Sequence, residues 1–320
     1  DILPVLENMG LRVEAEYPYQ IWGETNTPIW IQDFHAKIEG IIDQSVDKSS
    51  IQALRDNFEE CLKGIWDKNI ENDSLNRLVL LADMKWRDVK ILRTYVRYMR
   101  QTKLPFSLPY MEQAATDYPQ IARLLVDYFY AKFEPRKDKK APANLADTIA
   151  VKIEQELQNV TSLDQDRVLR ALFATMKASL RTNFFQKDAG GKFKSWVSVK
   201  LDSAQVPNIP DPRPFREIFV YSPRIEGIHL RGGKIARGGL RWSDRHEDFR
   251  VEILGLMKAQ QVKNSVIVPM GAKGGFVVKM PPKTGGRAAY QDEGIACYQP
   301  FIRGLLDITD TSLGPKIIPP

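Results

Sequence analysis

Apolar residues recur at helical spacing through the middle of the chain, from residue 49 to residue 187. The first such stretch places four apolar side chains three or four positions apart: Ile51, Leu54, Phe58 and Leu62. Ser49 or Ser50 is positioned to cap this helix. The same spacing recurs in four later stretches, 78–81, 89–99, 121–129 and 145–187. We therefore predict a helical region over 49–187 whose aromatic residues pack into a core.

The pattern before this region indicates a small α/β unit over residues 1–48. Apolar residues between positions 2 and 9 predict a short helix that ends at Gly10. Alternation at 11–15 predicts a strand, and a second strand is predicted at 29–34. Three elements are too few to enclose a core, so we expect them to be part of a larger unit.

Strands and helices alternate after residue 188. Strands are predicted at 197–201, 217–221, 225–230, 265–269 and 276–279, and another begins at Lys316. Helices are predicted at 247–262 and 286–307, the second with Pro300 inside it. This order predicts an α/β domain over 188–320 with a mixed or largely parallel sheet. The fold class expected for the chain is mixed α/β: a small α/β fragment, a helical block, then an α/β domain.

Composition narrows the function classes. The 320 residues are 43% hydrophobic and 27% charged, which is typical of a packed globular protein of about two domains. No apolar run is long enough to cross a membrane. Cys61 and Cys297 are far apart, and the three histidines lack metal-ligand spacing, so no disulfide framework or metal site is expected. The first residues show neither Met nor a signal-peptide pattern, so we expect a piece of a cytoplasmic protein.

The charge balance argues against nucleic-acid binding. The chain has 46 basic and 40 acidic residues, a net charge of +6, without a dense basic stripe. The densest basic run, 136–140, lies between Pro135 and Pro142, and we interpret it as part of a solvated linker over 134–144.

Candidate chemistry gathers between residues 231 and 279, where glycine pairs alternate with cations. The pairs are 232–233, 238–239 and 274–275, with Gly271 beside the last. The cations between them are Lys234, Arg237, Arg241, Lys258, Lys263 and Lys273. Glycine turns with nearby cations suit a small anion. The alternative is that the glycines only form hairpins. Neither a phosphate-binding loop nor a dinucleotide fingerprint is present in this stretch.

Three runs from this stretch resemble the substrate domain of glutamate dehydrogenases. They are Ala236-Arg237-Gly238-Gly239-Leu240-Arg241-Trp242, Lys263-Asn264-Ser265 and Pro269-Met270-Gly271-Ala272-Lys273-Gly274-Gly275. The longer pattern, including Ser243-Asp244-Arg245 and 258–264, resembles the very large bacterial NAD-specific branch. The resemblance is specific over 170–280 and weaker over 1–169. It implies that 1–48 is part of an ACT-like regulatory module, 49–187 a helical region and 188–320 the substrate-binding catalytic domain.

The resemblance also implies roles for individual residues. Lys263 binds the substrate α-carboxylate, and Lys273, in a glycine-rich turn, is the catalytic lysine. Arg237 stands where smaller enzymes of the family have a lysine for the side-chain carboxylate. Gly238, Gly239, Gly271 and Gly274 are further substrate-site candidates, and we expect the glycine turns at 238–239 and 274–275 to form the walls of the pocket.

Five further residues carry weaker expectations. Lys258 is a further substrate-site candidate, although it lies about 140° around a helix from Lys263. Arg241, Asp244 and Arg245 favour a structural ion-pair network. His246 favours a position on the surface or at a helix start.

Charge supports this assignment, because glutamate and 2-oxoglutarate carry two carboxylates whose removal from water needs at least two cations. In such a site a neutral Lys273 activates the water that attacks the iminium intermediate. The implied reaction oxidises L-glutamate with NAD to 2-oxoglutarate and ammonium, with NAD bound by a domain beyond residue 320 and the enzyme a homo-oligomer. The fragment alone is expected to be inactive. The alternative is a non-catalytic regulatory or assembly module that binds a small acidic or phosphorylated effector.

Overall fold

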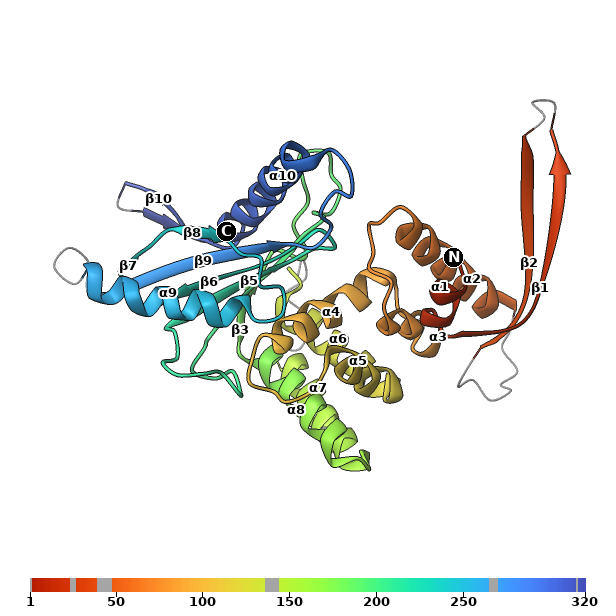
Figure 1. Cartoon of the computed structure of the whole chain (residues 1–320). Coiled ribbons are helices and arrows are strands. Elements are labelled where there is room, and N and C mark those ends of the chain that lie inside the picture. The colour runs from red at the N-terminus through yellow and green to blue at the C-terminus, as the bar shows by residue number, and fades with distance from the viewer. Residues whose placement is uncertain (1, 24–26, 39–47, 136–143, 265–269, 315) are drawn as a thin grey trace. The chain divides into compact units, whose positions relative to one another are not determined.

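The computed structural model describes residues 2–23, 27–38, 48–135, 144–264, 270–314 and 316–320 (Figure 1). The predicted strand at 265–269 and the basic run at 136–140 lie outside these residues. The chain forms two compact units, one of residues 1–90 and 115–123, the other of residues 91–114 and 124–320.

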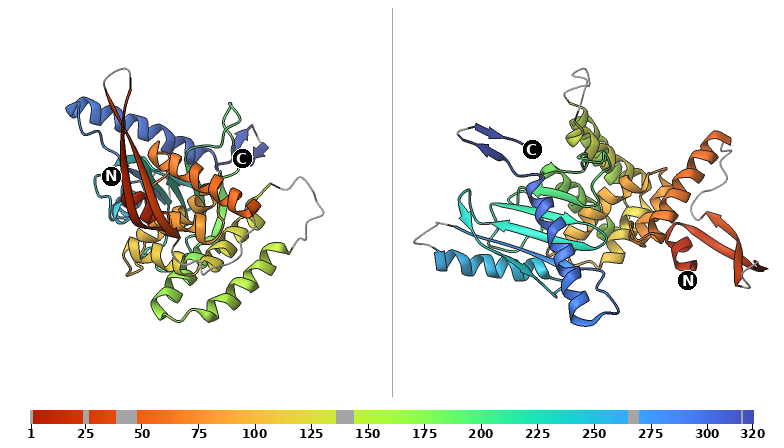
Figure 2. Two further views of the ribbon diagram at one scale, coloured as in Figure 1. Left: turned by 90° about the vertical axis from the view of Figure 1, so that its right-hand side faces the viewer. Right: turned by 90° about the horizontal axis from the view of Figure 1, so that it is seen from above.

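The first unit begins with helix α1 (Leu3–Asn8), and Gly10 follows it with a φ of 87°, as expected for a residue that ends a helix. Strands β1 (Leu11–Trp22) and β2 (Pro28–Ile38) form an antiparallel hairpin that is longer than predicted (Figure 2). Helix α2 (Lys48–Trp66), a 3₁₀ turn (Ser74–Arg77) and α3 (Leu78–Leu81) follow.

Two details of α2 correct the sequence prediction. The helix begins at Lys48, so Ser49 and Ser50 lie inside it and are not its cap. Ile51 is 54% exposed, whereas Cys61 and Ile65 are buried. The buried stripe therefore lies toward the end of α2, where residues of this unit such as Ile70 pack against it.

The helices of the second unit enclose an aromatic core, as predicted. They are the C-terminal part of α4 (Trp86–Arg100), parts of α5 (Leu108–Asp117) and α6 (Pro119–Phe133), α7 (Leu145–Glu156) and α8 (Leu163–Lys177). Phe129 makes edge-on contacts with Tyr95 and Phe184, at centroid distances of 6.2 and 5.4 Å. The helical prediction for 145–187 is wrong at its end, where Ser179–Thr182 forms strand β3, because these residues pair with β4.

A mixed seven-stranded sheet carries the rest of this unit. Its strands are β3, β4 (Val197–Leu201), β5 (Arg216–Tyr221), β6 (Ile225–Arg231), β7 (Ala236–Arg237), β8 (Leu240–Trp242) and β9 (Met270–Val278). The order is β3-β4-β5-β6-β9-β7, with β8 also on β9. Neighbours from β3 to β9 are antiparallel, and only β7 and β8 run parallel to β9. The sheet is therefore mixed but mainly antiparallel.

Helices α9 (Phe249–Asn264) and α10 (Gly286–Leu306) cover opposite faces of the sheet (Figures 1 and 2). Phe301 of α10 lies against Gly227 of β6, and Ile253 of α9 lies against Gly275 of β9. The α10 face is an apolar core that includes Val220, Phe276 and Phe301. A short hairpin of β10 (Thr311–Leu313) and β11 (Lys316–Ile318) follows α10, so the strand predicted at Lys316 does not join the main sheet.

Candidate active site

The edge of the sheet beside β9 consists of β7 and β8, which form two halves of one edge strand. Ala236 pairs with Met270 and Leu240 with Gly274, so the register offset is the same on both sides of Gly238 and Gly239. The amide of Gly274 donates to the carbonyl of Gly239 at 3.1 Å and holds the interruption against β9. The two glycines therefore lie beside Ala272 and Lys273.

Position 238 has no space for a side chain because a backbone atom of β9 lies against it. A Cβ at this position would lie 1.4 Å from the carbonyl oxygen of Ala272, which is backbone and cannot rotate away. At Gly239, by contrast, the nearest atom to an added Cβ is the Nζ of Lys273, at 3.9 Å. The lysine side chain therefore reaches the exposed backbone of Gly239, and the glycine leaves the space beside the ammonium open.

Lys273 lies in the middle of β9 and is half-buried. This corrects the prediction of a glycine-rich turn: residues 270–278 form one strand, and Gly274 and Gly275 are strand residues. They are glycines because Leu240 and Ile253 occupy the positions where their side chains would lie, at 2.3 and 2.2 Å from an added Cβ. No hydrogen bond or ion pair joins the Lys273 ammonium to any part of the chain that the structure describes.

The structure places the other predicted site residues as follows. Arg237 is exposed in β7 and pairs with Gly271, two positions from Lys273 on the same side of the strand pleat. Gly271 is buried, and its carbonyl accepts from the amide of Gly232 at 2.9 Å. Lys258 is an exposed residue of α9. Lys263 lies in the last turn of α9, and its side chain is outside the described residues.

An ion-pair network joins the edge strand to α9, as the sequence indicated for Arg241 and Arg245. Asp244, the third residue of that expectation, is exposed and forms no ion pair within the described residues. Arg241 pairs closely with Glu252 of α9, and the hydroxyl of Ser243 donates to the same carboxylate at 2.5 Å. Arg245 pairs with Asp248 just before the helix. Sequence reasoning missed Glu252, which interacts with both ends of the Arg241–Ser243 segment. Its position on α9 facing Arg241 depends on the tertiary arrangement rather than on a local motif.

A buried polar cluster fixes the first turn of α9 on the sheet. Arg250 and Glu217 of β5 form an ion pair with 0% exposure of either side chain, through contacts of 2.5 and 2.9 Å. The hydroxyl of Tyr98, in α4, donates to Glu217 at 3.1 Å. Burial, together with the charge of Glu217, raises the pKa of Tyr98 well above its usual value. This cluster was not predicted, because the three residues are far apart in the sequence.

His229 is a second titratable group close to the glycine pair 274–275. It lies in β6 opposite Gly274, and its ring would be 3.1 Å from a Cβ there. Burial, with the charge of Arg231 as a smaller cause, lowers the pKa of His229 to about 4. The imidazole is therefore neutral near pH 7. His246, as predicted, is exposed just before α9.

Two further features, a metal-binding cluster and a membrane-spanning helix, can be assessed for the described residues. Among the described residues, no group of three or more His, Cys, Asp or Glu side chains is arranged to hold a metal ion. Within the same residues, no helix combines the length and apolarity that crossing a bilayer requires.

Comparisons with known families match three segments of the chain. The catalytic domain of bacterial NAD-glutamate dehydrogenase matches residues 152–320, helical motif 3 of glutamate dehydrogenase matches 70–135, and its ACT3 domain matches 1–51. The predicted order of an ACT-like fragment, a helical region and a catalytic domain is confirmed.

Curated relatives agree. The chain is 47% identical over 320 residues to the NAD-specific glutamate dehydrogenase of Halomonas elongata, covering 100% of this chain and 19% of the relative. Identity to the enzyme of the same name from Pseudomonas aeruginosa is 49% over 325 residues, which cover 100% of this chain and 20% of the relative. Identity to the NAD-specific glutamate dehydrogenase of Mycobacterium tuberculosis is 44% over 315 residues, which cover 97% of this chain and 19% of the relative. The chain thus spans about a fifth of the length of these relatives. With the catalytic-domain match covering more than half of its residues, the chain belongs to the bacterial NAD-glutamate dehydrogenase family.

Proposed function

We propose that the protein containing this chain oxidises L-glutamate with NAD and water to 2-oxoglutarate, ammonium and NADH, and that residues 188–320 bind the substrate. The observation that carries the proposal is the half-buried ammonium of Lys273, which lies beside the exposed backbone of Gly239 and has no hydrogen-bond or ion-pair partner among the described residues. A cation without a carboxylate partner in a partly buried position favours an anionic ligand.

The two carboxylates of glutamate need cations at separate positions. We propose Lys263 for the α-carboxylate and Arg237 for the side-chain carboxylate. Arg237 supports this role because it is exposed beside Gly271, on the same side of the strand pleat as Lys273. Lys258 points to solvent, which favours a weaker contribution from this residue.

Lys273 is proposed as the acid–base catalyst. In its neutral form the amine accepts a proton from the water that attacks the iminium carbon of the oxidised substrate. The resulting ammonium form returns that proton to the nitrogen, and the C–N bond then breaks to release ammonia. As the carbonyl forms, the hydroxyl proton passes to the neutral amine and from it to ammonia, so that ammonium departs. A positioned lysine can perform these transfers because Gly239 leaves room for a substrate carbon next to its Nζ.

NAD is assigned to no residue of this chain. No Gly-x-Gly-x-x-Gly run occurs in the 320 residues. The relatives are about five times as long, and we propose that NAD binds in a part of the protein that this chain does not include. A cytoplasmic location and a homo-oligomeric assembly belong to the same proposal, as does the inactivity of residues 1–320 alone.

The test compares three variants in the full-length protein by NADH formation. Lys273→Ala is expected to lower kcat by about 10²–10⁴-fold, the usual contribution of an acid–base group. Lys273→Arg retains the positive charge but cannot deprotonate, so it is expected to lose a similar factor in kcat with little change in KM. Lys192→Ala removes an exposed lysine elsewhere on the same domain and serves as the control.

Full activity in both Lys273 variants would contradict the assignment. Activity in Lys273→Arg alone would show that the charge, rather than proton transfer, is what Lys273 supplies. Lys263→Ala is expected mainly to raise KM for glutamate, because its carboxylate partner is charged in both the ground and the transition state.

A further inference from the structure

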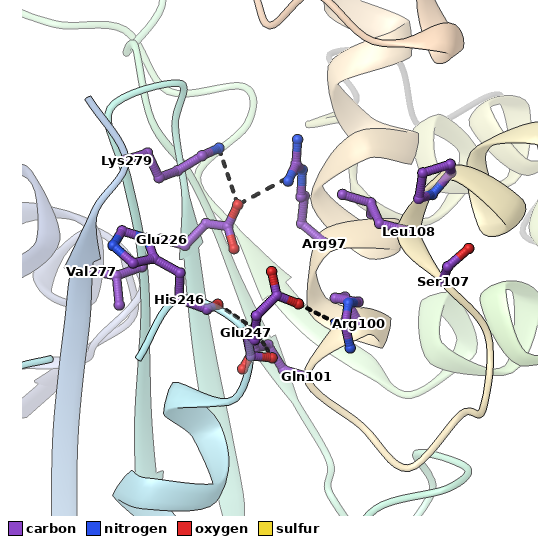
Figure 3. Close-up of a pocket in the computed structure, with 11 residues that line it drawn as sticks. Arg97, Arg100, Gln101, Ser107, Leu108, Glu226, His246, Glu247, Val277 and Lys279 are labelled. Atoms are coloured by element: carbon purple, nitrogen blue, oxygen red, sulfur yellow. Dashed lines mark hydrogen bonds and ion pairs between the residues drawn. The ribbon is translucent and has the colours of Figure 1, made fainter. Parts of the chain in front are cut away.

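A cavity in the second compact unit lies away from Lys273. Its volume is about 440 Å³, and it is bounded by the last turn of α4, residues 107–109, the ends of β6 and β9, and the residues just before α9 (Figure 3). Lys279, on its wall, directly follows β9 and comes six positions after Lys273, which corresponds to about 20 Å of extended chain. The cavity is therefore distinct from the proposed glutamate site.

The lining of this cavity carries one more cation than carboxylates. Its charged side chains are Arg97, Arg100, Lys279, Glu226 and Glu247. Glu226 is nearly buried and interacts with two of the cations, Lys279 at 3.0 Å and Arg97 at 3.8 Å. These three residues form a fixed charged wall, which Figure 3 shows on one side of the cavity.

Arg100 differs from the other cations because its partner faces solvent. It pairs closely with Glu247, whose side chain is 77% exposed. An exposed ion pair of this kind contributes little net stability, since both groups are well solvated when apart. A ligand carboxylate or phosphate in the cavity can therefore replace Glu247 on the Arg100 guanidinium, which offers a planar, two-pronged set of donors.

Part of the lining is apolar. Leu108 and Pro109 of α5 and Val277 of β9 line the cavity, and Figure 3 shows Leu108 and Val277 on opposite sides of the charged groups. A volume of this size exceeds what an inorganic anion fills, and the apolar side chains gain by contact with carbon atoms of a ligand. The lining thus combines an anion-binding arginine with a surface for a short hydrocarbon group.

We propose that this cavity binds a small organic anion, with its carboxylate or phosphate group on Arg100 and its apolar part against Leu108, Pro109 and Val277. Binding displaces the Glu247 carboxylate into solvent. The site requires neither glutamate nor NAD, so it stands independently of the proposed dehydrogenase activity.

The opposite charges of Arg100 and Glu247 give a sharp test by calorimetric titration of the full-length protein. The probes are pentanoate and butyl phosphate, with pentanol as the uncharged control and inorganic phosphate as the control without a hydrocarbon group. Arg100→Gln is expected to weaken binding of the organic anion by about 10-fold or more, because it removes a charge-assisted hydrogen bond. Glu247→Gln is expected to tighten binding up to about 5-fold, because it removes the competing carboxylate.

A control variant and a comparison between the two organic anions decide the outcome. Arg55→Gln breaks an exposed Arg–Glu pair in the other unit and is expected to leave binding unchanged. Binding of pentanoate alone identifies a carboxylate ligand, and binding of butyl phosphate alone identifies a phosphate ligand. The proposal is overturned if neither organic anion binds more tightly than pentanol, or if butyl phosphate binds and inorganic phosphate binds as tightly. It is equally overturned if Arg100→Gln and Glu247→Gln change the Kd in the same direction.

Discussion

Replacing Gly238 by alanine tests the geometry of the edge strand directly. The added methyl carbon would lie 1.4 Å from the carbonyl oxygen of Ala272, and real Cβ contacts essentially never fall below 3.0 Å. The backbone must therefore move by at least about 1.6 Å, the difference between these two distances. The obstacle is a backbone atom inside β9, so the movement has to occur in the edge strand.

The expected loss in stability follows from this displacement. Overpacking costs about 1–3 kcal/mol in general, and we expect the upper end because no side-chain rotation relieves the contact. An edge strand that separates also loses the hydrogen bond from the amide of Gly274 to the carbonyl of Gly239. The amide of Gly274 is therefore the local reporter, and about 3 kcal/mol corresponds to about 10²-fold faster hydrogen exchange.

Gly239→Ala is the matched control for this experiment. Its Cβ would meet only the Nζ of Lys273, at 3.9 Å, an ordinary contact distance. Exchange at Gly274 and overall stability should change by no more than about 0.5 kcal/mol, as for other exposed positions. Glutamate binding should nevertheless weaken, because the methyl group occupies the space beside the ammonium. Equal exchange rates at Gly274 in the two variants would refute the close approach of Gly238 to β9.

Two further predictions concern buried charge. The pKa of His229 in the folded protein is about 4, below its usual 6.5, so the unfolded state takes up the proton first as the pH falls. The free energy of unfolding should therefore decrease by about 2–3 kcal/mol between pH 6.5 and pH 4. Urea unfolding of His229→Gln at pH 7 and pH 4.5 should lack this part of the pH dependence, and a pH dependence equal to that of the unmodified protein would contradict the prediction. Glu217→Gln leaves the Arg250 guanidinium buried without a countercharge and should cost about 3–5 kcal/mol, whereas the double variant Glu217→Leu, Arg250→Met should recover much of the loss in the same urea assay. A double variant as unstable as Glu217→Gln would refute this explanation.

Local patterns predicted the longer elements of the second unit. The strands predicted at 197–201 and 217–221 and the helix predicted at 247–262 correspond to β4, β5 and α9. Both strands are buried on their two faces, and a short apolar run without strict alternation is typical of such strands. The edge strand β7–β8 was missed because two- and three-residue strands carry too little periodicity to detect.

The candidate site was predictable only in part. Glycines at 274 and 275 resemble a turn in the sequence, but in the structure they make room for Leu240 and Ile253, which are distant in the chain. The proximity of Lys273 to Gly239 depends on the parallel register of β8 on β9, which no local pattern specifies. The roles of Lys263 and Arg237 remain predictions.

The constant register across Gly238 and Gly239 also limits how the length of this segment can vary in related sequences. In the edge strand, Arg241 faces α9 and pairs with Glu252, while the next residue, Trp242, stacks on Phe276 and Tyr290 on the α10 side. Deleting one glycine would exchange these two sides and direct a guanidinium into the aromatic layer. Natural insertions and deletions at this point should therefore come in pairs of residues, or be absorbed before Ala236.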